Sequence, residues 1–164
     1  MINYVDNKKL FAEMCRYKEA CNTALEVGKH KPRVPEYVGE CILLIANRLS
    51  TKYQFCNYQY REDMVADGVE NCLLYIDNFN PEKSENPFSY FTQIIYYAFL
   101  RRIQSEKKHL YLKYKLQSNN DFSEKNVVHD SDDKIYSGKS YLDAEKVNTF
   151  ITDFENYMTK KKTK

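Results

Sequence analysis

The chain of 164 residues has no tryptophan, and with 4 glycines and 4 prolines it is poor in residues that break regular structure. All-β sandwiches and barrels need many tight turns, so this scarcity favours helices. Long apolar runs are also missing, and no stretch approaches the length of a membrane span. The first residues do not resemble a signal peptide, so we expect a soluble, cytoplasmic protein without membrane contacts.

Patterns typical of metal sites, disulfide scaffolds and enzymes are absent as well. The five cysteines lack C-x-x-C spacing, and most fall at positions typical of a helical core, so we expect buried, reduced thiols. The three histidines, His30, His109 and His129, are scattered, and no phosphate-binding glycine loop or catalytic triad is evident. We therefore expect no metal, no cofactor and no enzymatic activity.

The residues that are present predict an all-α fold, since 43% of them are hydrophobic and many recur at helical spacing. The predicted helices cover about 7–25, 35–49, 61–76 and 87–115. The clearest apolar stripe, in the second helix, consists of Val38, Cys41, Ile42, Ile45, Ala46 and Leu49. In the third helix, the residues expected to point inward are Val65, Val69, Cys72, Leu73 and Ile76. In the fourth, they are Phe91, Ile94, Ile95, Ala98, Phe99 and Ile103.

Composition divides the chain into three parts. Residues 1–116 form the predicted compact helical core. Residues 117–140 are rich in Asn, Ser, Asp and Lys, have little periodicity and are expected to be a flexible linker. Residues 141–164 form an amphipathic segment that closes in a run of lysines.

Charge is segregated between the third and fourth helices, although the net charge of the chain is only +2. The third helix and its following loop carry seven acidic residues: Glu62, Asp63, Asp67, Glu70, Asp77, Glu82 and Glu85. The fourth carries six basic ones: Arg101, Arg102, Lys107, Lys108, Lys113 and Lys115. An acidic face suits a basic protein partner, whereas a basic helix with nearby tyrosines suits phosphates and unpaired bases. Two different partners are therefore expected.

Motif spacing resembles region 2 of the bacterial sigma factors. Asp63-Met64-Val65-Ala66-Asp67-Gly68 is similar to the Asp-Leu-Ile-Gln-Glu-Gly that opens a helix of that region. Phe88-Ser89-Tyr90-Phe91-Thr92 is similar to the Phe-Ser-Thr-Tyr-Ala that opens the next. The similarity covers about 35–113. The short length, Met64 to Gly68, Asn86-Pro87 and Thr92-Gln93 resemble more closely the late-transcription sigma factors of T-even-type bacteriophages.

This resemblance implies a factor that binds bacterial core RNA polymerase in an infected host and directs initiation at a short minus-ten-type promoter element. The third helix would dock on the clamp helices of the polymerase's largest subunit. Its implied polymerase-binding residues are Asp63, Asp67, Glu70, Val69 and Leu73. The following helix would capture promoter DNA as it melts. The residues expected to bind DNA there are Tyr90, Phe91, Ile94, Ile95, Tyr97, Arg101, Arg102, Lys107 and Lys108.

The sequence departs from the family at this DNA-binding helix. Primary sigma factors have tryptophan at the positions of Ile94 and Ile95, so Tyr90 and Tyr97 would have to stack the bases. A simpler interpretation places Phe88 and Phe91 in the core. No helix-turn-helix for a minus-thirty-five element is recognisable.

The phage relatives also use a co-activator and a replication sliding clamp, which binds a short hydrophobic and acidic motif near the end of the sigma factor. Phe150, Ile151 and Phe154 are the candidate clamp-binding residues here, by position and composition alone. Alternatively, the segment is an ordinary amphipathic helix that folds back on the domain. A second function also stays open, namely a regulator that binds polymerase without reading promoter DNA.

Overall fold

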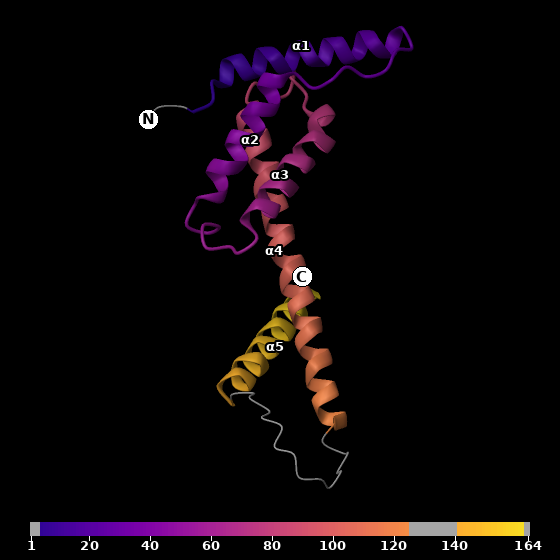
Figure 1. Ribbon diagram of the computed structural model, residues 1–164. Helices are drawn as coiled ribbons and strands as arrows, with labels where there is room; N and C mark the ends of the chain where they lie inside the picture. The colour runs from indigo at the N-terminus through magenta and orange to yellow at the C-terminus, as the bar shows by residue number, and fades with distance from the viewer. Residues whose placement is uncertain (1–3, 125–140, 163–164) are drawn as a thin grey trace. The chain divides into compact units, whose positions relative to one another are not determined.

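The computed structural model describes residues 4–124 and 141–162 and confirms the all-α fold, with no β-strand in either range. Its α-helices are α1 (Asn7–Glu26), α2 (Glu36–Ser50), α3 (Arg61–Tyr75), α4 (Pro87–Glu124) and α5 (Tyr141–Lys162). A short 3-10 helix, η1 (Ile76–Asn78), follows α3. The chain forms two compact units, residues 1–103 and 104–164, and α4 contributes to both (Figure 1). None of the described helices is long and apolar enough to cross a membrane.

Helix boundaries follow the capping residues. The Asp6 carboxylate accepts hydrogen bonds from the backbone N–H groups of Lys8 and Lys9, as an N-cap does. At the start of α4, the Asn86 side chain accepts from the Ser89 N–H at 3.0 Å, and Pro87 occupies the first turn. After α1, Gly28 adopts φ +69°, the left-handed conformation that glycine tolerates at a helix end.

Helix α4 is longer than the sequence predicts. It continues past Lys115 to Glu124, so residues 117–124 are helical where a flexible linker was expected. Extending an existing helix costs less than nucleating one, which lets weak helix formers join its end. The remainder of the expected linker, 125–140, lies outside the described residues.

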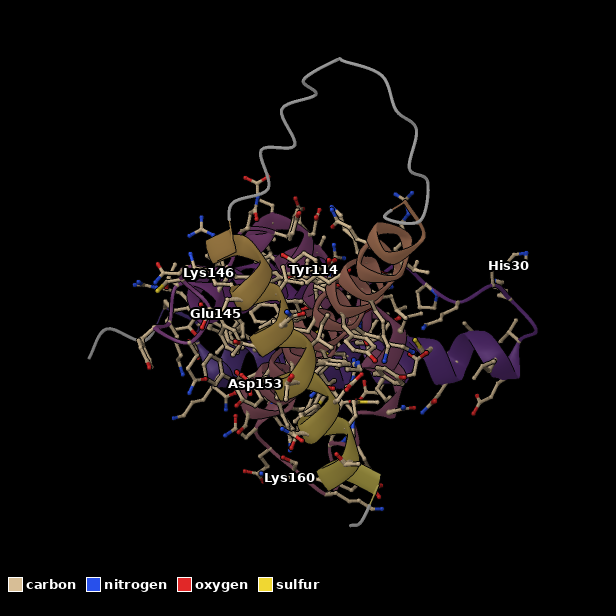
Figure 2. The ribbon with its side chains drawn as sticks, turned by 90° about the horizontal axis from the view of Figure 1, so that it is seen from below. His30, Tyr114, Glu145, Lys146, Asp153 and Lys160 are labelled. Atoms are coloured by element: carbon tan, nitrogen blue, oxygen red, sulfur yellow. The ribbon has the colours of Figure 1, made fainter. Side chains whose placement is uncertain are left out.

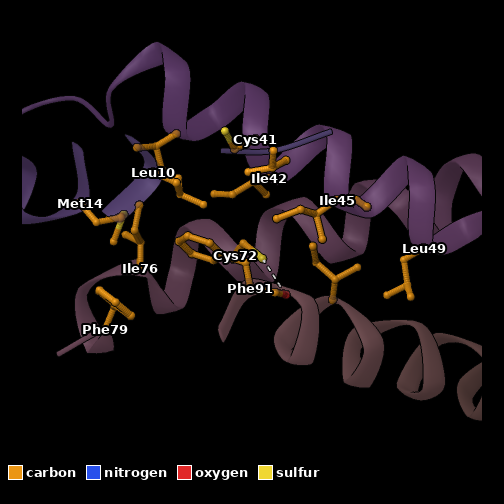
Figure 3. Close-up of a cluster of buried hydrophobic side chains, with 14 of the residues drawn as sticks. Leu10, Met14, Cys41, Ile42, Ile45, Leu49, Cys72, Ile76, Phe79 and Phe91 are labelled. Atoms are coloured by element: carbon orange, nitrogen blue, oxygen red, sulfur yellow. Dashed lines mark hydrogen bonds between the residues drawn. The ribbon is translucent and has the colours of Figure 1, made fainter. Parts of the chain in front are cut away.

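The core of the first unit lies where α1 to α4 meet. The predicted stripe of α2 is confirmed, because all six of its residues are buried. Leu10 and Met14 of α1 lie against this region, with Ile76 and Phe79 beside them (Figure 3). Helix α1 runs across the end of α2 (Figure 1) and is tied to the α3–α4 connection by the Lys18 ammonium, which donates to the backbone oxygens of Asp77 and Phe79.

Helix α3, with η1 after it, agrees with the prediction at Cys72 and Ile76, which are buried, and differs from it at Val65, Val69 and Leu73. Its buried residues are Met64, Gly68 and Cys72, whereas Val65 and Val69 are partly exposed and Leu73 is 43% exposed. The reason is Gly68, where α4 approaches so closely that an added Cβ would lie 2.9 Å from Phe99 Cε1. Cys72 follows on the same face and lies against the backbone of Phe91 (Figure 3).

Candidate functional site

The outward side of α3 forms an apolar groove of about 580 Å³ with α2. Its lining is Leu43, Glu62, Val65, Ala66, Val69, Glu70, Leu73 and Leu74, which we call the α2–α3 groove. Two leucines of the groove have large solvent-exposed fractions, 49% for Leu43 and 67% for Leu74. An apolar floor beside the carboxylates of Glu62 and Glu70 suits a helix that carries both apolar and basic residues.

The five predicted polymerase-binding residues divide between two sides of α3. Val69, Glu70 and Leu73 line the α2–α3 groove. Asp63 and Asp67 instead face α4, where the Arg102 guanidinium donates to Asp63 Oδ2 at 3.2 Å and to Asp67 Oδ2 at 3.1 Å. The two aspartates therefore hold an arginine of the same chain, while their side chains remain 59% and 34% exposed.

The same ion pairs engage part of the predicted DNA-binding helix. Arg102 bridges both carboxylates, and its side chain is 25% exposed. Its neighbour Arg101 is exposed and donates to the Asn71 side-chain oxygen at 2.6 Å. These links cross between α3 and α4, so the segregated charges read from the sequence partly neutralise one another.

The structure contradicts the prediction that Phe91 and Ile95 contact DNA, since both side chains are fully buried. They occupy the face of α4 that also carries Phe99 and packs on α3. Spacing of four residues places all three on one side of a helix. The simpler interpretation of Phe91 as a core residue is confirmed.

The remaining predicted DNA-binding residues differ in accessibility. Ile94 is partly buried, whereas Tyr97 is 51% exposed. The Tyr90 hydroxyl donates to the Tyr75 backbone oxygen at 2.6 Å, and burial raises the pKa of this hydroxyl above its ordinary value. Lys107 and Lys108 are exposed on the part of α4 that belongs to the second unit. Tyr97 is thus the predicted base-stacking ring most open to solvent.

In the second unit, the candidate clamp-binding residues pack against α4. Phe154 stacks on Tyr111 with ring centroids 4.8 Å apart, and Phe150 meets Tyr114 edge-to-face at 5.7 Å. The Glu155 carboxylate accepts from Tyr111 and from Lys115. Ile151 is partly buried. The segment therefore folds back on α4, which is the alternative that the sequence left open.

The outer surface of α5 is charged. Glu145, Lys146, Asp153 and Lys160 are exposed along it, and Figure 2 labels them together with Tyr114 of α4. His30, also labelled there, is exposed in the connection after α1. Within 4–124 and 141–162, no group of three or more His, Cys, Asp or Glu side chains could hold a metal ion.

Two comparisons with known proteins found no match to this chain. No protein-family model matches the sequence, and no curated protein is significantly similar to it. The resemblance to sigma region 2 therefore depends on the motifs of the chain itself.

Proposed function

We propose that this chain is a sigma-type initiation factor that binds bacterial core RNA polymerase and directs initiation at a short minus-ten-type promoter element. The observation that carries the proposal is the α2–α3 groove, because it joins exposed Leu73 and partly buried Val69 to Glu62 and Glu70 on one side of a helix. Apolar contacts there would supply binding energy, and the carboxylates would select a basic coiled coil such as the clamp helices. The chain would act in the cytoplasm of an infected bacterium as a binding protein and not as an enzyme.

Promoter contacts in this proposal fall on the accessible residues of α4. Tyr97 would stack an unpaired base, while Arg101, Lys107 and Lys108 would contact phosphates. Few such contacts are available, so the free protein should bind duplex DNA weakly.

The proposal includes a sliding clamp and a late co-activator as further partners, as the resemblance implies. Clamp binding through Phe150, Ile151 and Phe154 would require α5 to leave α4. The rings of Phe154 and Phe150 already contact those of Tyr111 and Tyr114. A clamp interaction would therefore compete with the fold of the second unit.

A polymerase-binding regulator without promoter recognition is the second candidate. The observation in its favour is that Phe91 and Ile95 are inaccessible and Arg102 is held by Asp63 and Asp67. Such a protein would use the α2–α3 groove alone.

Transcription in vitro distinguishes the two candidates. Core polymerases from candidate hosts are mixed with the chain on a supercoiled template that bears AT-rich late promoters. The test variant is Leu73→Asp, and the control is Leu25→Asp, because Leu25 is 76% exposed on α1 and lies outside the groove. Loss of a central apolar contact costs about 2–4 kcal/mol, so core affinity should fall about 30- to 700-fold in the first variant only.

Discrete start sites that disappear in Leu73→Asp and persist in Leu25→Asp would support the sigma factor. Core binding that depends on Leu73 without new start sites would favour the regulator. If no core polymerase binds the chain, both candidates are wrong.

A further inference from the structure

The connection between α2 and α3 contains a hollow that neither the motifs nor the proposed groove includes. It has a volume of about 480 Å³ and is lined by Leu49, Lys52, Tyr53, Gln54 and Tyr96. We call it the loop pocket. Four of its residues come from the end of α2 and the following turn, and Tyr96 comes from α4.

The turn that forms this pocket is firmly anchored. The Lys52 N–H donates to the Leu49 oxygen at 3.1 Å, and the Phe55 N–H donates to the Lys52 oxygen at 2.8 Å. Phe55 is only 2% exposed, and its ring meets Phe99 and Tyr96 edge-to-face at 5.2 and 5.9 Å. The buried phenylalanine therefore fixes both the turn and the Tyr96 wall.

Tyr53 lies on this hydrogen-bonded turn with 91% of its surface exposed. A tyrosine ring on a fixed backbone loses little conformational entropy when another ring stacks on it, because it has only two side-chain torsions. Tyr97, which is 51% exposed, lies next to the pocket with its ring 5.8 Å from that of Tyr96. The pocket thus continues the accessible aromatic surface of α4.

The chemistry of the lining matches an unpaired nucleobase. Tyr53 and Tyr96 offer aromatic surfaces, and base-aromatic stacking tolerates any base. The Gln54 amide can donate and accept at once, which suits the edge of adenine. Lys52 supplies a positive charge for an adjoining phosphate, and no carboxylate lines the pocket. A base within a duplex could not reach this surface, since both of its faces are stacked.

We propose that the loop pocket binds one unpaired base of single-stranded DNA. Tyr53 stacks on the base, Gln54 contacts its edge and Lys52 contacts the adjoining phosphate. The inference rests on the proposed function, because promoter opening supplies the unpaired strand. It assigns base capture to a loop of the chain in addition to α4.

The test measures the affinity of the core polymerase complex for forked promoter DNA whose displaced strand carries one abasic site at a time. The test variant is Tyr53→Ala. The matched control is Tyr75→Ala, because Tyr75 is 47% exposed and does not line the pocket. With the wild type, one abasic position should weaken binding about 5- to 150-fold. In Tyr53→Ala, intact DNA should bind more weakly by a similar factor, and that abasic position should cost nothing further.

An unchanged abasic profile in Tyr53→Ala, with initiation and core binding intact, would overturn the loop pocket and leave the proposed function standing. Lys52→Gln gives a second measurement, since loss of one phosphate contact should reduce the slope of log affinity against log salt by about one. An unchanged slope would count against the assignment of Lys52.

If the proposed function fails, the result looks different, since either no core polymerase binds the chain or core binding produces no new start sites. In that case the pocket is tested on the free chain with an oligodeoxynucleotide containing 4-thiothymidine. A photocrosslink to the 51–60 segment that is lost in Tyr53→Ala and kept in Tyr75→Ala supports the pocket. Equal crosslinking of single-stranded and duplex probes, or none, overturns it.

Discussion

Helix α4 takes part in two helix contacts of different kinds. In the first unit it packs on α3 through fully buried side chains, with Phe99 and Ile95 closing over Gly68. In the second unit it contacts α5 through half-exposed tyrosines and the Lys115–Glu155 ion pair at 2.6 Å. Buried apolar contacts keep their strength in salt and acid, whereas exposed ion pairs do not. The first contact should therefore hold the fold, and the second should open under mild conditions.

Gly68→Val should break the first contact and have the largest effect. An added Cβ would lie 2.9 Å from Phe99 and 3.0 Å from Ile95, both of which are fully buried, so these side chains would have to shift. Overpacking of this kind costs about 3 kcal/mol, which lowers the Tm by roughly 10 °C. Calorimetry measures the change.

Gly39→Val is the matched control for that experiment, because an added Cβ at Gly39 in α2 meets nothing within 4 Å. Valine is also a better helix former than glycine. The Tm of the Gly39→Val variant should stay the same or rise slightly. Equal losses in both variants would show that the close approach at Gly68 does not limit the packing.

Phe154→Ala should open the second contact without affecting the first. The substitution removes the ring that stacks on Tyr111, at a cost of about 2 kcal/mol to the α4–α5 contact. Amide exchange in α5 should become roughly 30-fold faster, while exchange in α2 and α3 is unchanged. The control is Asp153→Ala, since Asp153 is exposed on the outer side of α5 (Figure 2). Slower exchange in α5, or equal acceleration in both variants, would contradict the contact.

Arg102→Gln should have a smaller effect on the first contact. Arg102 holds Asp63 and Asp67, but the carboxylates remain 59% and 34% exposed, so solvent weakens the pairs. We expect the free energy of unfolding, measured with urea, to fall by about 1 kcal/mol. In Arg101→Gln it should fall by half of that or less. A larger loss in Arg101→Gln would mean that the bridge to Asp63 and Asp67 is not the stronger link.

Sequence alone predicted most of the fold because its signals are local. The stripe of α2 depends on spacing within a few residues and is confirmed. The caps at Asp6 and Asn86 are equally local, because each side chain bonds a backbone N–H two or three residues away. Helix α3 shows where such reasoning fails. It carries apolar residues on two adjacent faces, and the more hydrophobic face, with Leu73, is the less buried one. Hydrophobicity could not reveal that Gly68 permits the closest approach.

The candidate site was less predictable, because it depends on contacts between distant residues. The Arg102–Asp67 pair joins positions 35 apart and requires a particular rotation of α4. The loop pocket brings Tyr53 of the turn together with Tyr96 of α4. A loop has no hydrophobic periodicity from which such a contact could be predicted. A cluster of aromatic residues at 53–60 was the available signal.

Acidification should weaken the second contact, between α4 and α5, and this should be the smallest of the expected effects. Hydrogen bonds from Lys115 and Tyr111 lower the pKa of the Glu155 carboxyl below its ordinary value of 4.5. A lowered pKa means that the ion pair stabilises the folded contact above pH 4.5 and that this stabilisation is lost as pH falls through the folded value. Protection factors of α5 amides should therefore decrease below about pH 4.5, and less so in high salt. In Glu155→Gln this acid dependence should disappear, whereas Glu145→Gln, on the exposed side of α5, should retain it. If acid lowers α5 protection equally in both variants, the carboxylate of Glu155 is not the group that titrates.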